Sequence, residues 1–191
     1  MLKKMLSIIM AAAMIFGIVG CGSMESPETS VTNYLNAVKN QDAQTIAKYT
    51  GDDEEEAEEE TEDANAGDED FAQYAIDKLL GSMEYEIISS EEKDDTAAVT
   101  VSFTNVNMTV VVSEMMSNAI SLIFSGMSDE EMNTAMQGFF ITALENHEED
   151  LVTKEATISL KKGDGYWIVE NGDDLLDAAT GGIESAFSNI G

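Results

Sequence analysis

Two pairs of segments in this chain alternate apolar and polar residues, and each pair is divided by a short polar turn. The first turn lies at residues 91–94, and the second is the run KGDG at 162–165. A period of two puts alternate side chains on one face of a strand, so both pairs predict an antiparallel hairpin with one buried face. Trp167 follows the second turn and is expected to be the central aromatic residue of that face. The apolar positions are Met83, Tyr85 and Ile87, then Ala97, Val99, Val101 and Phe103, then Ala156, Ile158 and Leu160, and finally Trp167 and Val169.

Helical spacing of apolar residues precedes the first hairpin. Ser26 and Pro27 suit the cap and the first position of a helix, and Asp42 suits the cap of a second, short helix. A third apolar stripe, over residues 71–79, is expected to end at Gly81. We expect these three helices to pack on one face of the sheet.

A helical hairpin is predicted between the two strand pairs, over residues 108–146. Its second helix should begin with a capping box formed by Ser128 and Glu131. A final helix is expected over residues 175–187, weakened internally by the glycines at 181–182. The expected fold class is therefore α+β: a curved antiparallel sheet of about four strands packed by N-terminal helices, with an inserted helical hairpin and a C-terminal helix.

The beginning of the chain has the features of an export signal. Lys3 and Lys4 precede a run of 15 residues at 5–19 that is apolar apart from Ser7. A membrane-spanning helix needs about 20 such residues, so this run is typical of a signal-peptide core instead. The run ends with IVGC at residues 18–21, which resembles the lipobox of bacterial lipoproteins. That resemblance implies that Cys21 carries lipid and that the signal peptide is cleaved just before it.

This interpretation divides the chain into a signal peptide at 1–20, a tether at 21–26 and a single domain at 27–190. Two or more acyl chains give stable anchoring, because each buried CH₂ contributes about 0.8 kcal/mol. The expected location is the extracytoplasmic face of the cell membrane, with the lipid on Cys21 as the contact. The alternatives are ordinary secretion with an unmodified cysteine, or an uncleaved anchor.

Charge restricts the partners of the predicted mature chain. Without residues 1–20 it would hold seven lysines, no arginine and 38 acidic residues, a formal charge of −31. Arginine is the side chain best suited to bind phosphates and carboxylates, because its guanidinium group donates paired hydrogen bonds to them. Its absence therefore argues against nucleic acid, nucleotides and acidic substrates as partners. Cys21 is the only cysteine. No disulfide can form within the chain, and apolar packing alone must hold the core.

An acidic tract occupies residues 52–70, with 13 acidic side chains in 19 positions and no large apolar one. Such a segment cannot bury enough surface to offset its ordering entropy, so we expect a disordered insert. Carboxylates suit calcium, but the EF-hand pattern does not occur. A solvated low-complexity insert is therefore favoured over a specific calcium site.

The ionisable residues do not assemble into a recognisable catalytic site. His147 is the only histidine and falls in a polar link, so a solvated role is favoured over pH sensing or metal binding. Asp77 lies beside apolar residues and is the best candidate for a base, although a surface carboxylate is the favoured interpretation. Glu84 and Glu86 alternate with apolar residues and should face water. No histidine and cysteine spacing suits a transition metal, and no glycine-rich phosphate loop occurs, so we expect neither metal nor cofactor.

Methionine is the one unusual apolar feature, with six residues crowded into 29 positions of the predicted helical hairpin. Methionine fills irregular gaps in cores, and it also forms surfaces that adapt to varied partners. Core filling is favoured over a partner-binding groove, and a Cu(I) site is the least favoured alternative. The six are Met108, Met115, Met116, Met127, Met132 and Met136.

Two stretches carry a family resemblance. The runs SVTNYLNAVKNQDAQTIAKYT (30–50) and VTKEATISLKKGDGYWIVENGDDLLDAATGGI (152–183) are similar to the opening helices and the closing hairpin of small lipoproteins in the nuclear transport factor two-like (cystatin-like) superfamily. The runs FTNVNMTVVVSEMM (103–116) and LLDAATGG (175–182) resemble Gram-positive lipoproteins that bear a domain of unknown function. The superfamily resemblance implies a curved sheet and lid helices that enclose a cone-shaped pocket. The acidic insert and the long helical hairpin depart from that pattern and could cover the pocket mouth.

The function that these features favour is a non-enzymatic module that binds an unknown small molecule or envelope protein beside the membrane. Some members of the superfamily are isomerases or dehydratases, so the alternative is a small enzyme of that type that uses a pocket carboxylate. The sequence offers no buried acid or base for it. The discriminating feature is whether the pocket contains an ionisable side chain.

Overall fold

The computed structural model describes residues 24–51, 66–122, 125–171 and 175–188, with only the backbone described at 66–70 and at Asn171. The predicted signal peptide and Cys21 lie outside these residues. All helices and strands described here fall in the part of the chain that follows Cys21. No helix within the described ranges is long and apolar enough to cross a membrane.

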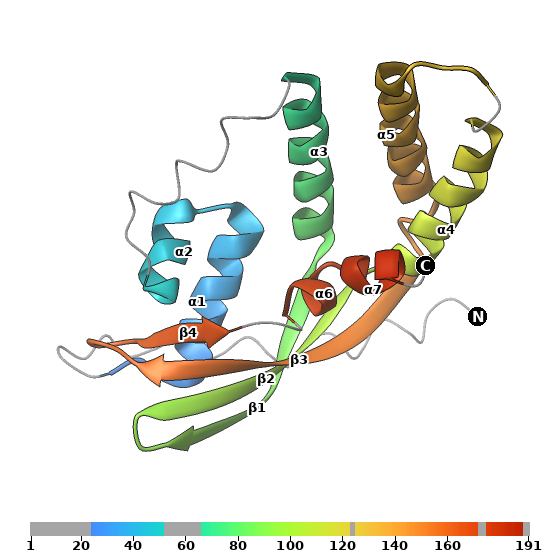
Figure 1. The fold of residues 1–191 in the computed structure, drawn as a ribbon. Coiled ribbons are helices and arrows are strands. Elements are labelled where there is room, and N and C mark those ends of the chain that lie inside the picture. Colours follow the sequence, from blue (N-terminus) through green and yellow to red (C-terminus); the bar gives the residue numbers. More distant parts are fainter. Residues whose placement is uncertain (1–23, 52–65, 123–124, 172–174, 189–191) are drawn as a thin grey trace, which may run out of the picture.

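Four strands form one antiparallel sheet in the order β1-β2-β3-β4. The strands are β1 (Glu84–Lys93), β2 (Thr96–Val106), β3 (Leu151–Lys162) and β4 (Trp167–Asn171). The two central strands pair Thr96 with Lys161 at one end and Val106 with Leu151 at the other. Both hairpin turns therefore lie at one end of the sheet, which we call the turn end (residues 91–96 and 161–166), and the β2–β3 connection lies at the opposite, helix end (Figure 1).

The buried face of the sheet has the predicted alternation. Val99, Val101 and Phe103 of β2 and Ile158 of β3 are fully buried, and Trp167 is 1% exposed. The indole N–H of Trp167 donates a hydrogen bond to the Glu25 carbonyl at 3.0 Å, so its polar atom is satisfied inside the core. The prediction that this residue lies on the buried face is confirmed.

Strand β1 is an edge of the sheet and has an irregular register between Ile87 and Ser89. Glu84 and Glu86 are exposed, as predicted from their alternation with apolar neighbours. Ile88, at the irregularity, is 52% exposed.

Helices α1 (Pro27–Asn40) and α2 (Ala43–Thr50) pack beside the sheet and begin at the predicted caps. The Ser26 hydroxyl accepts from the Thr29 N–H at 3.2 Å, and the Asp42 carboxylate accepts from the Thr45 N–H at 3.1 Å. The apolar stripe of α1 places Val31 and Leu35 in the same core cluster as Trp167. The expected covering of the sheet by N-terminal helices is confirmed for these two helices, whereas Leu79 of the third belongs to a separate core cluster.

Helix α3 (Ala66–Ser82) is longer than predicted at both ends. It begins inside the acidic tract, so residues 66–70 of the predicted disordered insert are helical, whereas 52–65 lie outside the described residues. Three of these residues are acidic, which the positive end of a helix dipole favours. The helix also continues one residue past Gly81, to Ser82, since Gly81 lacks the positive φ of a glycine that ends a helix.

The inserted helical hairpin consists of α4 (Met108–Ala119), a 3₁₀ turn η1 (Ile120–Leu122) and α5 (Asp129–Asn146), as predicted over 108–146. The capping box is present, with both Ser128 and Glu131 in their expected roles. Two of the six methionines, Met108 and Met115, are buried in the core of this layer. The others are only partly covered, and Met127 and Met132 are 42% and 36% exposed, so core filling accounts for part of the cluster.

The expected final helix is divided into α6 (Leu175–Ala179) and α7 (Ile183–Ser188). Gly181 and Gly182 separate them, with φ angles of 69° and 91°. A Cβ on Gly181 would lie 1.8 Å from the Val106 carbonyl oxygen, so only glycine fits this close approach to β2. The glycines therefore break the helix and do more than weaken it. With that detail, the predicted α+β fold class is confirmed.

Candidate functional site

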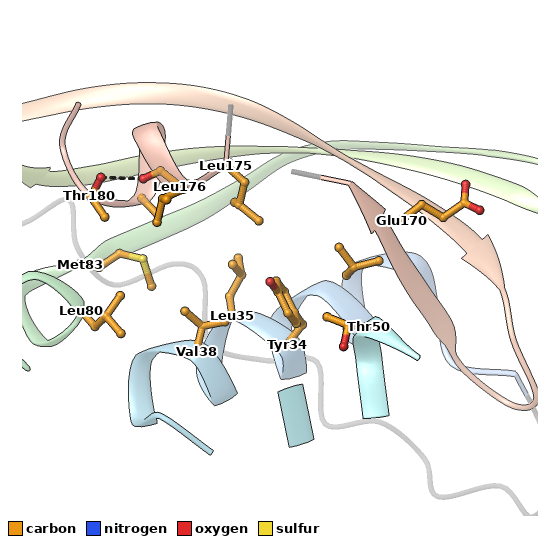
Figure 2. A pocket seen from close by; sticks show the side chains of 12 residues that line it. Tyr34, Leu35, Val38, Thr50, Leu80, Met83, Glu170, Leu175, Leu176 and Thr180 are labelled. Atoms are coloured by element: carbon orange, nitrogen blue, oxygen red, sulfur yellow. Dashed lines mark hydrogen bonds between the residues drawn. The ribbon is translucent and has the colours of Figure 1, made fainter. Parts of the chain in front are cut away.

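An apolar cleft of about 430 Å³ lies between α1, the end of α3, β4 and α6. Figure 2 shows side chains from these elements converging on the same space. Leu35, Met83 and Ala179 are buried in its floor, and Leu176, 62% exposed, stands at the rim. The complete lining is Tyr34, Leu35, Val38, Thr50, Leu80, Met83, Val169, Glu170, Leu175, Leu176, Ala179 and Thr180.

The hydroxyl groups of two lining threonines are bonded within their own helices. Thr180 donates to the Leu176 carbonyl at 2.6 Å, the bond drawn in Figure 2. Thr50 donates to the Ile46 carbonyl at 3.2 Å. Because both hydroxyls already have acceptors in the backbone, the walls that they form offer a ligand mainly methyl groups.

In the part of the chain that the structure describes, Glu170 is the only carboxylate that lines the cleft. It follows the buried Val169 on β4, and the alternation of a strand turns its side chain to the opposite side. Glu170 is exposed, and in Figure 2 its carboxylate points away from the leucine-lined floor. The cleft therefore suits an apolar ligand better than it suits acid–base chemistry.

Asn105 joins three elements that border the cleft, and it was not among the candidate residues predicted from the sequence. It is 1% exposed, and its side-chain N–H groups donate to the carbonyls of Leu79 at 2.8 Å and Ala179 at 2.7 Å. Its amide oxygen accepts from the Ser82 hydroxyl at 2.7 Å and from the Val106 N–H at 2.8 Å. One side chain thus joins α3, β2 and α6. Its signal in the sequence is its place in the buried alternation of β2, where every earlier member is apolar.

His147 is not the solvated linker residue that its sequence context favoured. Its ring nitrogens lie 2.8 Å from Glu114 Oε2 and 2.6 Å from Asp150 Oδ2, and its side chain is 24% exposed. The hydrogen bond to Asp150, with a smaller contribution from Glu114, raises the pKa of the imidazole. The correction has a simple cause: α4 and α5 pack side by side, which brings Glu114 to a residue 33 positions away.

Asp77 has the surface position that was favoured over a catalytic one. It is exposed on α3 and accepts hydrogen bonds from the side chains of Gln41 and Gln73, both at 2.7 Å. These bonds, the one from Gln41 first, lower the pKa of the carboxyl group. Asp77 does not line the apolar cleft.

Metal binding finds no support in the geometry of the described part of the chain. There, no group of three or more histidine, cysteine, aspartate or glutamate side chains is placed to hold an ion. His147 with its two carboxylates is accordingly an ion-pair cluster. Cys21, the predicted lipidation site, lies outside the described residues.

No family model matches this chain, and no curated protein matches it. Among solved structures it is similar to a protein from Bacillus subtilis described as a lipoprotein, ycdA, with 15% sequence identity and a TM-score of 0.42. The alignment covers 82% of this chain and 48% of that one, so this chain spans about half the length of its structural relative. Similarity at this level assigns neither a family nor a function. The nuclear transport factor two-like resemblance stays a prediction.

Proposed function

We propose that this chain is a lipoprotein, anchored through Cys21 to the extracytoplasmic face of the cell membrane, whose domain binds an apolar ligand without chemical turnover. The observation that carries the binding function is the cleft of about 430 Å³ between α1, β4 and α6. Clefts of this size, lined by apolar side chains with few polar groups, are the usual form of a small-molecule site. The anchoring half of the proposal rests on the lipobox resemblance at residues 18–21.

The lining residues also bear on the enzymatic alternative. An isomerase or dehydratase needs an acid or base inside an apolar pocket, where burial adjusts its pKa. Among the described residues that line the cleft, Glu170 is the only carboxylate, and it is exposed and turned outward. The arrangement supports a binding module, and the position of Glu170 makes it the residue to test for catalysis.

A neutral dye tests the cleft directly. N-phenyl-1-naphthylamine becomes fluorescent in apolar surroundings, and its lack of charge avoids repulsion by an acidic protein. We expect the chain that begins at Cys21 to bind this dye, and Leu176→Glu to abolish binding, because the new charge would stand at the rim of the cleft. Ile88→Glu is the matched control: it makes the same substitution at a similarly exposed residue, 52% against 62%, on an edge strand that does not line the cleft.

The assignment of the site would be contradicted if both variants lost dye binding equally, or if neither variant lost it.

Mass spectrometry of ligands extracted from the purified parent protein would give the chemical class of the natural occupant. Conversion of that ligand by the parent protein but not by Glu170→Gln would replace the binding module with the enzymatic alternative.

A further inference from the structure

The start of the folded domain is clamped to the turn end of the sheet. The Glu25 N–H donates to the Gly165 carbonyl at 2.9 Å, and the Glu25 carbonyl accepts from the Trp167 indole at 3.0 Å. The Glu25 carboxylate accepts from the hydroxyls of Ser30 and Tyr49, both at 3.0 Å. The same Ser30 oxygen accepts from the Trp167 backbone N–H at 3.0 Å. These bonds fix the backbone at Glu25 against the β3–β4 turn.

Met24 continues the attachment, because its partly buried side chain packs against the core cluster that contains Trp167. Cys21 is only three residues before Met24. Three residues of fully extended chain span at most about 11 Å. Wherever the intervening residues run, a lipid on Cys21 must therefore enter the bilayer within a short distance of the turn end.

The charge of the turn end is unusual for this chain. Together with Glu25 and with Lys48, whose Nζ lies 4.6 Å from the centre of the Tyr166 ring, it carries four lysines and six carboxylates. The predicted mature chain as a whole carries seven lysines and 38 carboxylates. Four of the seven lysines are therefore gathered at the place where the tether leaves the domain. Lysines are the side chains that anionic headgroups attract.

From the clamp, the short tether and the position of the lysines we infer that the turn end is a membrane-apposed surface, whose lysines contact the headgroup phosphates of the anchoring bilayer. This inference rests on the lipid anchor proposed above. The lysines of this surface are Lys48, Lys93, Lys161 and Lys162. Strand β2 leads from it to the helix end over 11 residues, roughly 35 Å. The α4–α5 hairpin, with exposed Ile120, Met127 and Met132, consequently projects away from the membrane, where it is accessible to other envelope components (Figure 1).

The single cysteine allows a direct test. The chain from Cys21 onward is coupled through its thiol to maleimide-bearing lipid in vesicles of phosphatidylcholine and phosphatidylglycerol. Lysines are then acylated with an N-hydroxysuccinimide ester and quantified by mass spectrometry. The comparison sample is the same chain, capped at Cys21 with a soluble maleimide and mixed with the same vesicles. We expect labelling of Lys161 and Lys162 to fall several-fold on the coupled vesicles, and labelling of Lys78 and Lys154 to stay unchanged.

A lengthened tether is the matched control. An insertion of about 20 glycine and serine residues after Gly22 allows the domain to move roughly 25 Å from its anchor, so the protection should be lost. Uniform labelling of all lysines on the vesicles, selective protection of Lys78, or protection that survives the insertion would each overturn the inference. Because the anchor is attached chemically, this result does not depend on whether cells lipidate Cys21 or on whether the cleft binds a ligand.

Discussion

Removal of the Asn105 side chain should destabilise the domain far more than its size suggests. Asn105→Ala removes four hydrogen bonds whose partners belong to α3, β2 and α6 and remain in place. Each such bond contributes about 1 kcal/mol net, and more where the partner stays buried and unsatisfied. We therefore expect a loss of about 3–5 kcal/mol from the free energy of unfolding, a large share of the 5–15 kcal/mol typical of a domain.

Urea titration followed by the fluorescence of Trp167, the only tryptophan, measures this loss as a lower midpoint at an unchanged slope. The matched control is Asn40→Ala, because Asn40 is exposed and its amide donates to the Asn36 carbonyl of its own helix. That substitution should change stability by no more than about 0.5 kcal/mol. A loss below about 1 kcal/mol for Asn105→Ala would refute the conclusion that this side chain joins the three elements. Since Ala179 lines the cleft, dye binding by the variant should weaken even where it remains folded.

Three further predictions concern Trp167, Cys21 and His147. Trp167→Ala should cost about 3–5 kcal/mol and leave the protein mostly unfolded or aggregated; red-shifted and readily quenched fluorescence of the folded parent would contradict the buried position. Cys21→Ser should release the protein from membranes or leave the precursor uncut, and a variant that fractionates and migrates like the parent would exclude lipidation. His147 has a raised pKa in the folded state, so its pairs with Glu114 and Asp150 stabilise the fold fully below about pH 6.5 and lose this effect as the pH rises through the folded pKa. Urea midpoints measured across that range should decline in the parent, and His147→Gln should remove this part of the decline.

Features determined by short stretches of sequence were predicted well. The period of two along β2 and β3 gives both the strands and their buried face, since neighbouring side chains alternate regardless of what packs on them. The helix caps at Ser26, Asp42 and Ser128 could be predicted equally well, because each side chain bonds to a residue three positions along the same chain.

Features that depend on contacts between distant residues were predicted poorly. Asn105 lies 74 residues from its partner Ala179, and the acceptor role of Glu114 toward His147 arises only when α4 and α5 pack together. The cleft forms only because α6 lies beside α1, and no short stretch of sequence predicts that these two helices are neighbours. The division of the last helix illustrates the same limit: the two glycines were visible, but the reason for them is the Val106 carbonyl, from a strand far earlier in the chain.

The irregular register of β1 has a consequence for how copies of this protein meet. An edge strand with a regular, uncharged ladder offers its free N–H and C=O groups to any similar strand, and this is a common route to aggregation. In β1 the ladder is interrupted between Ile87 and Ser89, and exposed Glu84 and Glu86 stand on one side of the interruption. A second copy that approached this edge would have to match a bulge and bring carboxylates close together. Strand β1 is therefore poorly suited to pair with a second copy, and crowded molecules are not expected to join their sheets through this edge.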